Sequence, residues 1–159
     1  FSSSDMKEAF RDREETMRLY EPSITIGELT IAAYENGLEY NEELCRYLGR
    51  NAAAIRSYLE AECPELIMAD GNASFVTFID ASAIYSKAEK EVLSHPEKYP
   101  GGSGGGILSR FFGVNASVAM NDGTWFGKEW KKFVRFNYGT STERVMAALE
   151  RMKKAVDSL

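Results

Sequence analysis

The sequence of 159 residues suffices for one domain, or for a small domain with an appendage. Its net charge of −5 comes from interleaved acids and bases without a basic stripe, which gives nucleic-acid binding little support. No apolar run reaches the roughly 18 residues of a membrane helix, and the first ten residues lack the basic and apolar regions of a signal peptide. A cytoplasmic protein that contacts neither membrane nor nucleic acid is expected.

The first part of the chain predicts three helices. The first, about 5–19, is densely charged with a thin apolar side, and Pro22 disfavours its continuation. The second, 23–36, is apolar on most sides, which is typical of a buried helix. The third, about 41–62, has leucines and isoleucine at spacings of 4, 7 and 4, and Pro64 ends it. The third is therefore a long amphipathic helix.

The second part predicts strands mixed with helices. Two strands flank the Asp-Gly-Asn turn in "ELIMADGNASFVTFIDA", and "AIYSKAEKEVLS" is a short helix. Further on, the patterns predict a short helix at 107–113, a strand at 113–123, a tryptophan-bearing loop at 124–132, a strand at 133–139 and a helix from about 142. This order predicts an α+β fold: a small mixed or antiparallel sheet packed by the long helix and the C-terminal helix.

The low-complexity stretch "PGGSGGG" covers residues 100–106. A phosphate-binding loop needs a strand before it and a helix after it, and no strand precedes this stretch. A flexible surface loop is favoured, and an engineered joint has the same composition. Whether Gly101–Gly106 is natural or engineered stays open.

The two cysteines, Cys45 and Cys63, fall in or next to the long helix. In an unbroken helix they would lie about 27 Å apart, too far for a disulfide. We expect two buried thiols in a reducing compartment.

"FVRFNYGTS" places an arginine inside an apolar strand. Alternation along the strand puts Val134, Phe136 and Tyr138 on one face, and Arg135 with Asn137 on the other. A guanidinium so placed needs water or a partner. The partner is either one of the 24 acidic residues of the chain or the carboxylate or phosphate of a ligand, which the guanidinium fork fits in a bidentate way.

Several segments resemble fold-type I pyridoxal-phosphate enzymes of the class I/II aminotransferase group, nearest to the cystathionine β-lyase-like C–S lyases. They are "SSSDMKEAF", "EPSITIGELTIAAYENG", "LCRYLGRNAAAIRSYLEAECPEL", "NASFVTFIDA", "VAMNDGTWFG" and "FVRFNYGTSTERVMAALERMKKAV". Their most specific element is a G-x-x-F-G loop followed by F-V-R-x-N, and they cover nearly the whole chain.

The resemblance implies roles for five residues. Arg135 matches the arginine that binds the α-carboxylate of the amino-acid substrate, and Asn137 would orient it. Asp122, Gly123 and Thr124 match the turn that lines the substrate pocket. The resemblance further implies a pyridoxal-phosphate cofactor and a homodimer.

The departures from the family concern the cofactor. The family's cofactor lysine lies upstream of the serine cluster, so the chain is expected to begin after it. Lys7, in "SDMK", stands at a helix start rather than a strand end and is rejected for that role. The stretch 83–113 is longer than usual, and Thr140-Ser141 stands where many relatives have Pro-Arg. No catalytic, cofactor-binding or metal-binding residue is therefore assigned.

The interpretation is the C-terminal part of an aminotransferase or C–S β-lyase, inactive alone. Residues 1–38 would be a helical remnant of the large cofactor domain, and residues 39–159 the small domain; the missing large domain would be a partner. The alternatives are a stand-alone α+β module that binds small carboxylates or a protein, and a structural domain with Arg135 in a salt bridge.

Overall fold

The computed structural model describes residues 3–17, 23–71, 73–100 and 106–159. Contacts divide the chain into two units, 1–44 and 45–159. The predicted domain boundary between residues 38 and 39 stays a prediction. None of the helices in these described ranges is both long enough and apolar enough to cross a membrane.

The N-terminal elements are helices, as the sequence predicts. They are α1 (Ser4–Met17), α2 (Ile24–Asn36) and α3 (Leu38–Glu62), which begins in the first unit and ends in the second. The predicted end of the first helix, at about residue 19, lies outside the described residues. The all-round apolar pattern of α2 predicts burial, but its described apolar side chains are exposed, Leu29 by 67%.

The second unit contains a four-stranded antiparallel sheet in the order β1-β2-β4-β3. The strands are β1 (Ile67–Met68), β2 (Val76–Asp80), β3 (Asn121–Asp122) and β4 (Phe133–Asn137). In the central strand β4, Arg135 pairs with Phe78 of β2 on one side and with Asn121 of β3 on the other. The register therefore brings three distant segments together around Arg135.

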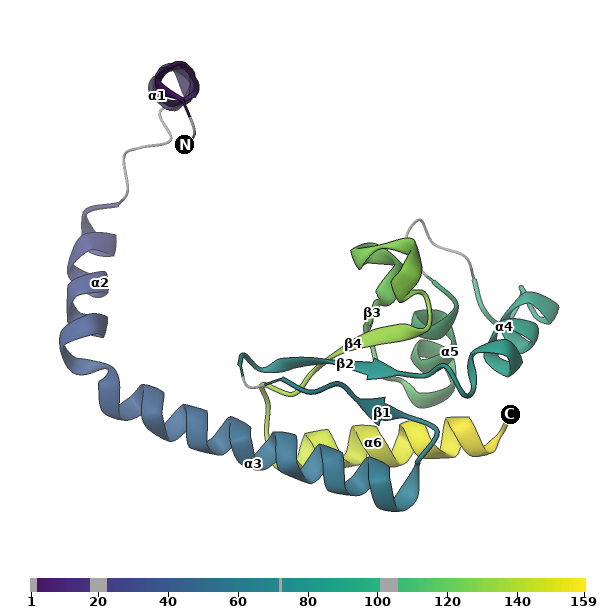
Figure 1. Cartoon of the computed structure of the whole chain (residues 1–159). Coiled ribbons are helices and arrows are strands. Elements are labelled where there is room, and N and C mark those ends of the chain that lie inside the picture. The colour runs from purple at the N-terminus through teal and green to yellow at the C-terminus, as the bar shows by residue number, and fades with distance from the viewer. Residues whose placement is uncertain (1–2, 18–22, 72, 101–105) are drawn as a thin grey trace. The chain divides into compact units, whose positions relative to one another are not determined.

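The hydrophobic core lies on one face of this sheet. Val134 and Phe136 are buried, and they belong to one core cluster with Ile55 and Leu59 of α3 and Leu149 of α6 (Thr142–Asp157). In Figure 1 the second half of α3 and α6 (yellow) lie on the same side of the sheet. This arrangement confirms the expected α+β fold, with the sheet packed by the long helix and the C-terminal helix, and shows the sheet to be antiparallel.

Asn51, buried in α3, connects that helix to the chain after β4. Its Nδ2 donates to the carbonyls of Tyr138 and Thr140, 3.1 and 2.9 Å away, and its Oδ1 accepts from Thr142 Oγ1 at 2.6 Å. Buried amides need such partners. Asn51 thereby holds the end of the arginine-bearing strand against α3.

The predicted strand at 113–123 is wrong over most of its length. The helix α5 (Ile107–Ala116) continues through Gly113, and Ser117 ends it with a left-handed φ of 52°. Phe112 and Ala116, four residues apart on this helix, are both buried in the core. Core packing thus selects a helix where local composition predicts a strand, and only Asn121–Asp122 pair as β3.

The other short elements follow the sequence more closely. The helix predicted after β2 is α4 (Tyr85–Ser94), which packs on α5. The tryptophan-bearing loop contains two 3-10 helices, η1 (Gly123–Phe126) and η2 (Lys128–Trp130).

The cysteines are both free thiols in this structure. Cys63 is buried as expected, and burial raises its pKa to about 11. Cys45 is exposed, so the expectation that both thiols are buried is wrong.

Candidate functional site

Arg135 lies on the face of β4 opposite the core, as the alternation predicts. Its neighbours Val134 and Phe136 are buried, whereas Arg135 is partly exposed and Asn137 is exposed. The guanidinium Nη2 donates a hydrogen bond of 2.6 Å to Oδ1 of Asn121, its direct cross-strand partner. The side chain therefore extends toward the 121–127 turn and away from α6.

The charge of Arg135 has no internal counter-ion in the described part of the chain: no ion pair joins it to a carboxylate there. Its Nε is buried and has no hydrogen-bond partner among the described atoms. Buried donors without acceptors are uncommon and cost free energy. The arrangement thus leaves a cation with unused donor capacity on the face of the sheet opposite the core.

Four aromatic rings in mutual contact lie on this side of the sheet, and we call them the aromatic wall: Phe78, Phe126, Trp130 and Phe133. Phe78 contacts Phe126 and Trp130 at centroid distances of 5.1 and 5.3 Å, and Trp130 contacts Phe133 at 5.1 Å. The guanidinium carbon of Arg135 lies 5.4 Å from the centroid of the Phe126 ring, within reach of a cation–π interaction. Phe126 and Trp130 are themselves 41% and 38% exposed, so the aromatic wall borders solvent.

Asp122, predicted to line the substrate pocket, is 1% exposed. Its Oδ1 accepts from the backbone N–H and the hydroxyl of Thr124, at 3.1 and 2.8 Å, and its Oδ2 accepts from the N–H of Ser109 at 3.3 Å. The carboxylate therefore caps the N-terminus of α5 and closes the turn into η1. These contacts give Asp122 a structural role in capping α5 and closing the turn. Its role in lining the substrate pocket stays a prediction.

Gly106 and Gly123 allow the turn to pack closely. A Cβ on Gly106 would overlap the carboxylate of Asp122, and a Cβ on Gly123 would overlap the carbonyl oxygen of Trp130. The glycine-rich residues 101–105 lie outside the described residues. At the helix that follows them, the N–H of Ser109, which an anion would otherwise use, is bonded to Asp122.

Asn137 and Thr124 are both exposed. Asn137 shares the face of Arg135, but its Oδ1 accepts from the N–H of Gly139 at 2.9 Å, so its described contact is with the following turn. Thr124 contacts Asp122 rather than Arg135. Their substrate-binding roles stay predictions. The residues that do contact the guanidinium, Asn121 and Phe126, lie within "VAMNDGTWFG" but carry no local signal of this contact.

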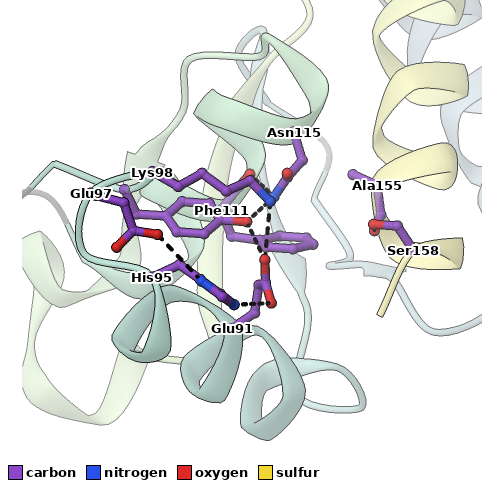
Figure 2. A network of polar contacts seen from close by, with 9 residues as sticks. Glu91, His95, Glu97, Lys98, Phe111, Asn115, Ala155 and Ser158 are labelled. Carbon is purple, nitrogen blue, oxygen red and sulfur yellow. Dashed lines mark hydrogen bonds and ion pairs between the residues drawn. The ribbon is translucent and has the colours of Figure 1, made fainter.

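A second polar cluster is centred on His95, the one histidine of the sequence. Its Nε2 lies 3.8 Å from Oε2 of Glu91, and its Nδ1 lies 3.4 Å from Oε1 of Glu97. Figure 2 shows the imidazole between these two carboxylates. Within the described residues, no group of three or more histidine, cysteine or acidic side chains is arranged to hold a metal ion.

The rest of this cluster has a structural role. The buried Tyr99 donates its hydroxyl proton to Glu91 at 3.0 Å and accepts from Asn115 of α5 at 2.8 Å. Lys98 also donates to Glu91, at 3.0 Å, and this bond is the largest cause that lowers the pKa of Glu91. The network joins α4 and the turn after it to α5 (Figure 2).

Two described lysines, Lys98 and Lys153, do not have the properties of a lysine that binds pyridoxal phosphate. A lysine that bonds covalently to a carbonyl group is activated by a lowered pKa. Hydrogen bonding with Tyr99 and Glu91 instead raises the pKa of Lys98, and the bond to Asp157 raises that of Lys153. The α5 N-terminus, where a phosphate could bind, is capped by Asp122. Neither these two lysines nor this helix terminus is therefore assigned to the cofactor.

Comparison with known proteins agrees with the resemblance read from the sequence. No protein-family model matches the chain. It is 26% identical over 125 residues, 79% of the chain, to the cystathionine β-lyase PatB of Bacillus subtilis. Cystalysin from Treponema denticola, whose structure contains pyridoxal 5′-phosphate, superposes with a TM-score of 0.74 over 99% of the chain at 20% identity. The pyridoxal-phosphate-bound C–S lyase of Staphylococcus hominis gives 0.63 over 80% at 23% identity.

The chain spans only part of each of these proteins: 28% of PatB, 36% of cystalysin and 29% of the Staphylococcus lyase. The two structural matches show that the chain shares the fold of one portion of larger pyridoxal-phosphate enzymes.

Proposed function

We propose that this chain is the C-terminal part of a pyridoxal-phosphate-dependent C–S β-lyase or aminotransferase, in which Arg135 binds the α-carboxylate of the amino-acid substrate. The observation that carries the proposal is the environment of Arg135. Arg135 is partly exposed, and its guanidinium lies beside the ring of Phe126, bonds to a neutral amide and pairs with no carboxylate of the described chain.

The chemistry of recognition follows from the guanidinium. Its planar N–H donors match the two oxygens of a carboxylate, and charge-assisted bonds of this type are about twice as strong as neutral ones. The ring of Phe126 lies beside the guanidinium and supplies an apolar neighbour on one side. By fixing the carboxylate, Arg135 would hold the substrate Cα in one position, which lowers the entropic part of the barrier.

The cofactor belongs to the proposal for the larger protein. Pyridoxal phosphate, when bound, supplies an electron sink for the electrons left when the Cα proton is removed. We place its binding lysine on the large domain of the complete protein, and residues 1–159 alone would then be inactive. A cytoplasmic homodimer is part of the same proposal.

A second candidate is a stand-alone module that binds small carboxylates without catalysis. One observation favours it: every residue of the core cluster lies between Ile55 and Val156, so the second unit has a core of its own. Both candidates use Arg135, but only the enzyme requires the cofactor for its activity.

The test is Arg135→Lys in the complete protein loaded with pyridoxal phosphate. Lysine keeps the charge but loses the bidentate fork. We expect kcat/KM for amino-acid substrates to fall roughly 10- to 150-fold, the equivalent of about 1.5–3 kcal/mol for a hydrogen bond to a charged group. The melting temperature should change little.

Arg144→Lys is the matched control, because Arg144 is exposed on α6 and outside the site. An Arg135→Lys enzyme with unchanged kcat/KM would exclude the clamp. Carboxylate binding by a complete protein with no cofactor-dependent activity would favour the module.

A further inference from the structure

We propose that Asn121 is a positioning residue for Arg135: it orients the guanidinium through a neutral acceptor and so reserves the positive charge for a ligand carboxylate. This inference rests on the proposed function, because it concerns the same site. It assigns to Asn121 a role that the family resemblance does not imply.

The cross-strand register brings the two side chains together. Asn121 of β3 is the direct partner of Arg135 in β4, and side chains directly opposite in an antiparallel pair lie on the same face. The bond from Nη2 to Oδ1 is 2.6 Å long. Because a guanidinium has only donors, the amide must present its oxygen and keep its NH₂ group turned away.

Asn121 is a neutral partner, so its hydrogen bond does not compensate the positive charge of Arg135. An aspartate at position 121 would form an ion pair with Arg135 and compensate its charge inside the protein. The amide instead engages one of the five N–H donors and leaves the net charge uncompensated. The buried, unpartnered Nε adds to the donors that the described structure leaves unsatisfied. A carboxylate that binds here would therefore contact a guanidinium that is already oriented and whose charge is not compensated by the protein.

Phe126 restrains the guanidinium from a second direction. Its ring centroid lies 5.4 Å from the guanidinium carbon. One in-plane hydrogen bond and one aromatic neighbour together limit rotation of the side chain. A side chain ordered before binding loses less entropy when the ligand arrives, so affinity is higher.

Asn121 itself is held by its chain neighbour. Asp122 is buried, pairs with Val134 in the sheet, and bonds to Ser109 and Thr124 through its carboxylate. The backbone at position 121 is therefore fixed between the sheet and α5, and the amide is presented to Arg135 from a rigid support.

The experiment follows Arg135 by NMR in the 159-residue chain, with arginine side chains labelled with ¹⁵N and acetate as the probe. Acetamide, the uncharged analogue of acetate, controls for non-ionic effects. Arg135→Met assigns the Nε–H signal and removes the clamp. Asn121→Ala removes the acceptor, and Asn121→Asp introduces a carboxylate of nearly the same shape. Asn41→Ala, on an exposed asparagine of α3, is the matched control.

In the wild-type chain we expect acetate, but not acetamide, to shift the Arg135 Nε–H signal, and Asn41→Ala to behave in the same way. Asn121→Ala should weaken acetate binding about tenfold, on the scale of one hydrogen bond. Asn121→Asp should weaken it at least as much while its melting temperature stays equal or rises, an outcome that a purely structural role of Asn121 would not produce. If Asn121→Ala does not fold, the isosteric Asn121→Asp variant carries the test.

Two results would overturn the inference, and they are distinguishable. If Asn121→Ala and Asn121→Asp bind acetate as tightly as the wild type while Arg135→Met does not bind, the positioning role is wrong and the clamp stands. If the wild-type chain shows no acetate-dependent shift at Arg135, the clamp itself fails and the positioning role fails with it.

Discussion

Replacing Asp122 with alanine should destabilise the second unit by about 2–3 kcal/mol. The buried carboxylate accepts bonds from the backbone N–H groups of Ser109 and Thr124, each worth about 1 kcal/mol. Its charge at the N-terminus of α5 adds about 0.3–1 kcal/mol. The hydroxyl of Thr124 is left out of this sum, because the residue is exposed and its hydroxyl can bond to water instead.

Asp122→Asn removes the charge of the side chain while keeping nearly the same shape. The amide keeps one oxygen for Thr124 but turns an NH₂ group toward the N–H of Ser109, so one bond and the helix-terminal charge are lost. We expect a loss of about 1–2 kcal/mol.

Urea denaturation measures both variants. The two tryptophans of the chain, Trp125 and Trp130, lie in η1 and η2 beside Asp122, and their fluorescence reports on this region while circular dichroism follows the helices. Asp70→Asn is the matched control: the Asp70 side chain is 97% exposed and should cost no more than about 0.5 kcal/mol.

Unfolding free energies of both Asp122 variants within about 0.5 kcal/mol of the wild type would refute the capping role. If Asp122→Asn kept its stability but weakened substrate capture in the complete protein, the substrate-lining role that the family resemblance implies would replace the capping role.

Three further predictions concern other parts of the chain. Iodoacetamide at pH 8 should modify the exposed Cys45 and spare the buried Cys63, and equal modification of both thiols in the folded chain would contradict this prediction. Burial raises the pKa of Cys63 from 9.0 to about 11. The free energy of folding that this pKa shift contributes is complete below pH 9 and is lost as the pH rises toward 11. The exposed apolar side chains of α2 should cause the chain to self-associate, and Leu29→Glu should reduce this association as measured by light scattering. A chain that stays monomeric at high concentration would contradict the prediction. Borohydride reduction with pyridoxal phosphate should leave no stoichiometric adduct on any one lysine, as read by mass spectrometry.

Local patterns were sufficient for the elements whose periodicity is strong. The alternation of "FVRFN" separates the buried Val134 and Phe136 from Arg135, and the structure has the same two faces. The C-terminal helix follows its apolar spacing because it presents one continuous stripe to the core, whereas the long helix buries only the later part of its stripe, Ile55 and Leu59, and leaves Leu44 exposed. The resemblance to C–S lyases and the α+β fold were also accessible, since they depend on motif order rather than on contacts.

Tertiary structure decided the features that depend on contacts between distant segments. Residues 113–116 have strand-like composition but continue α5, because Phe112 and Ala116 pack into the core. Asp122 caps a helix that begins fifteen residues earlier in the chain, and Asn121 meets Arg135 across two strands fourteen residues apart. A side chain's neighbours along the sequence do not specify such partners. The register of the sheet and the packing of the core do, because they determine which polar atoms come within hydrogen-bond distance.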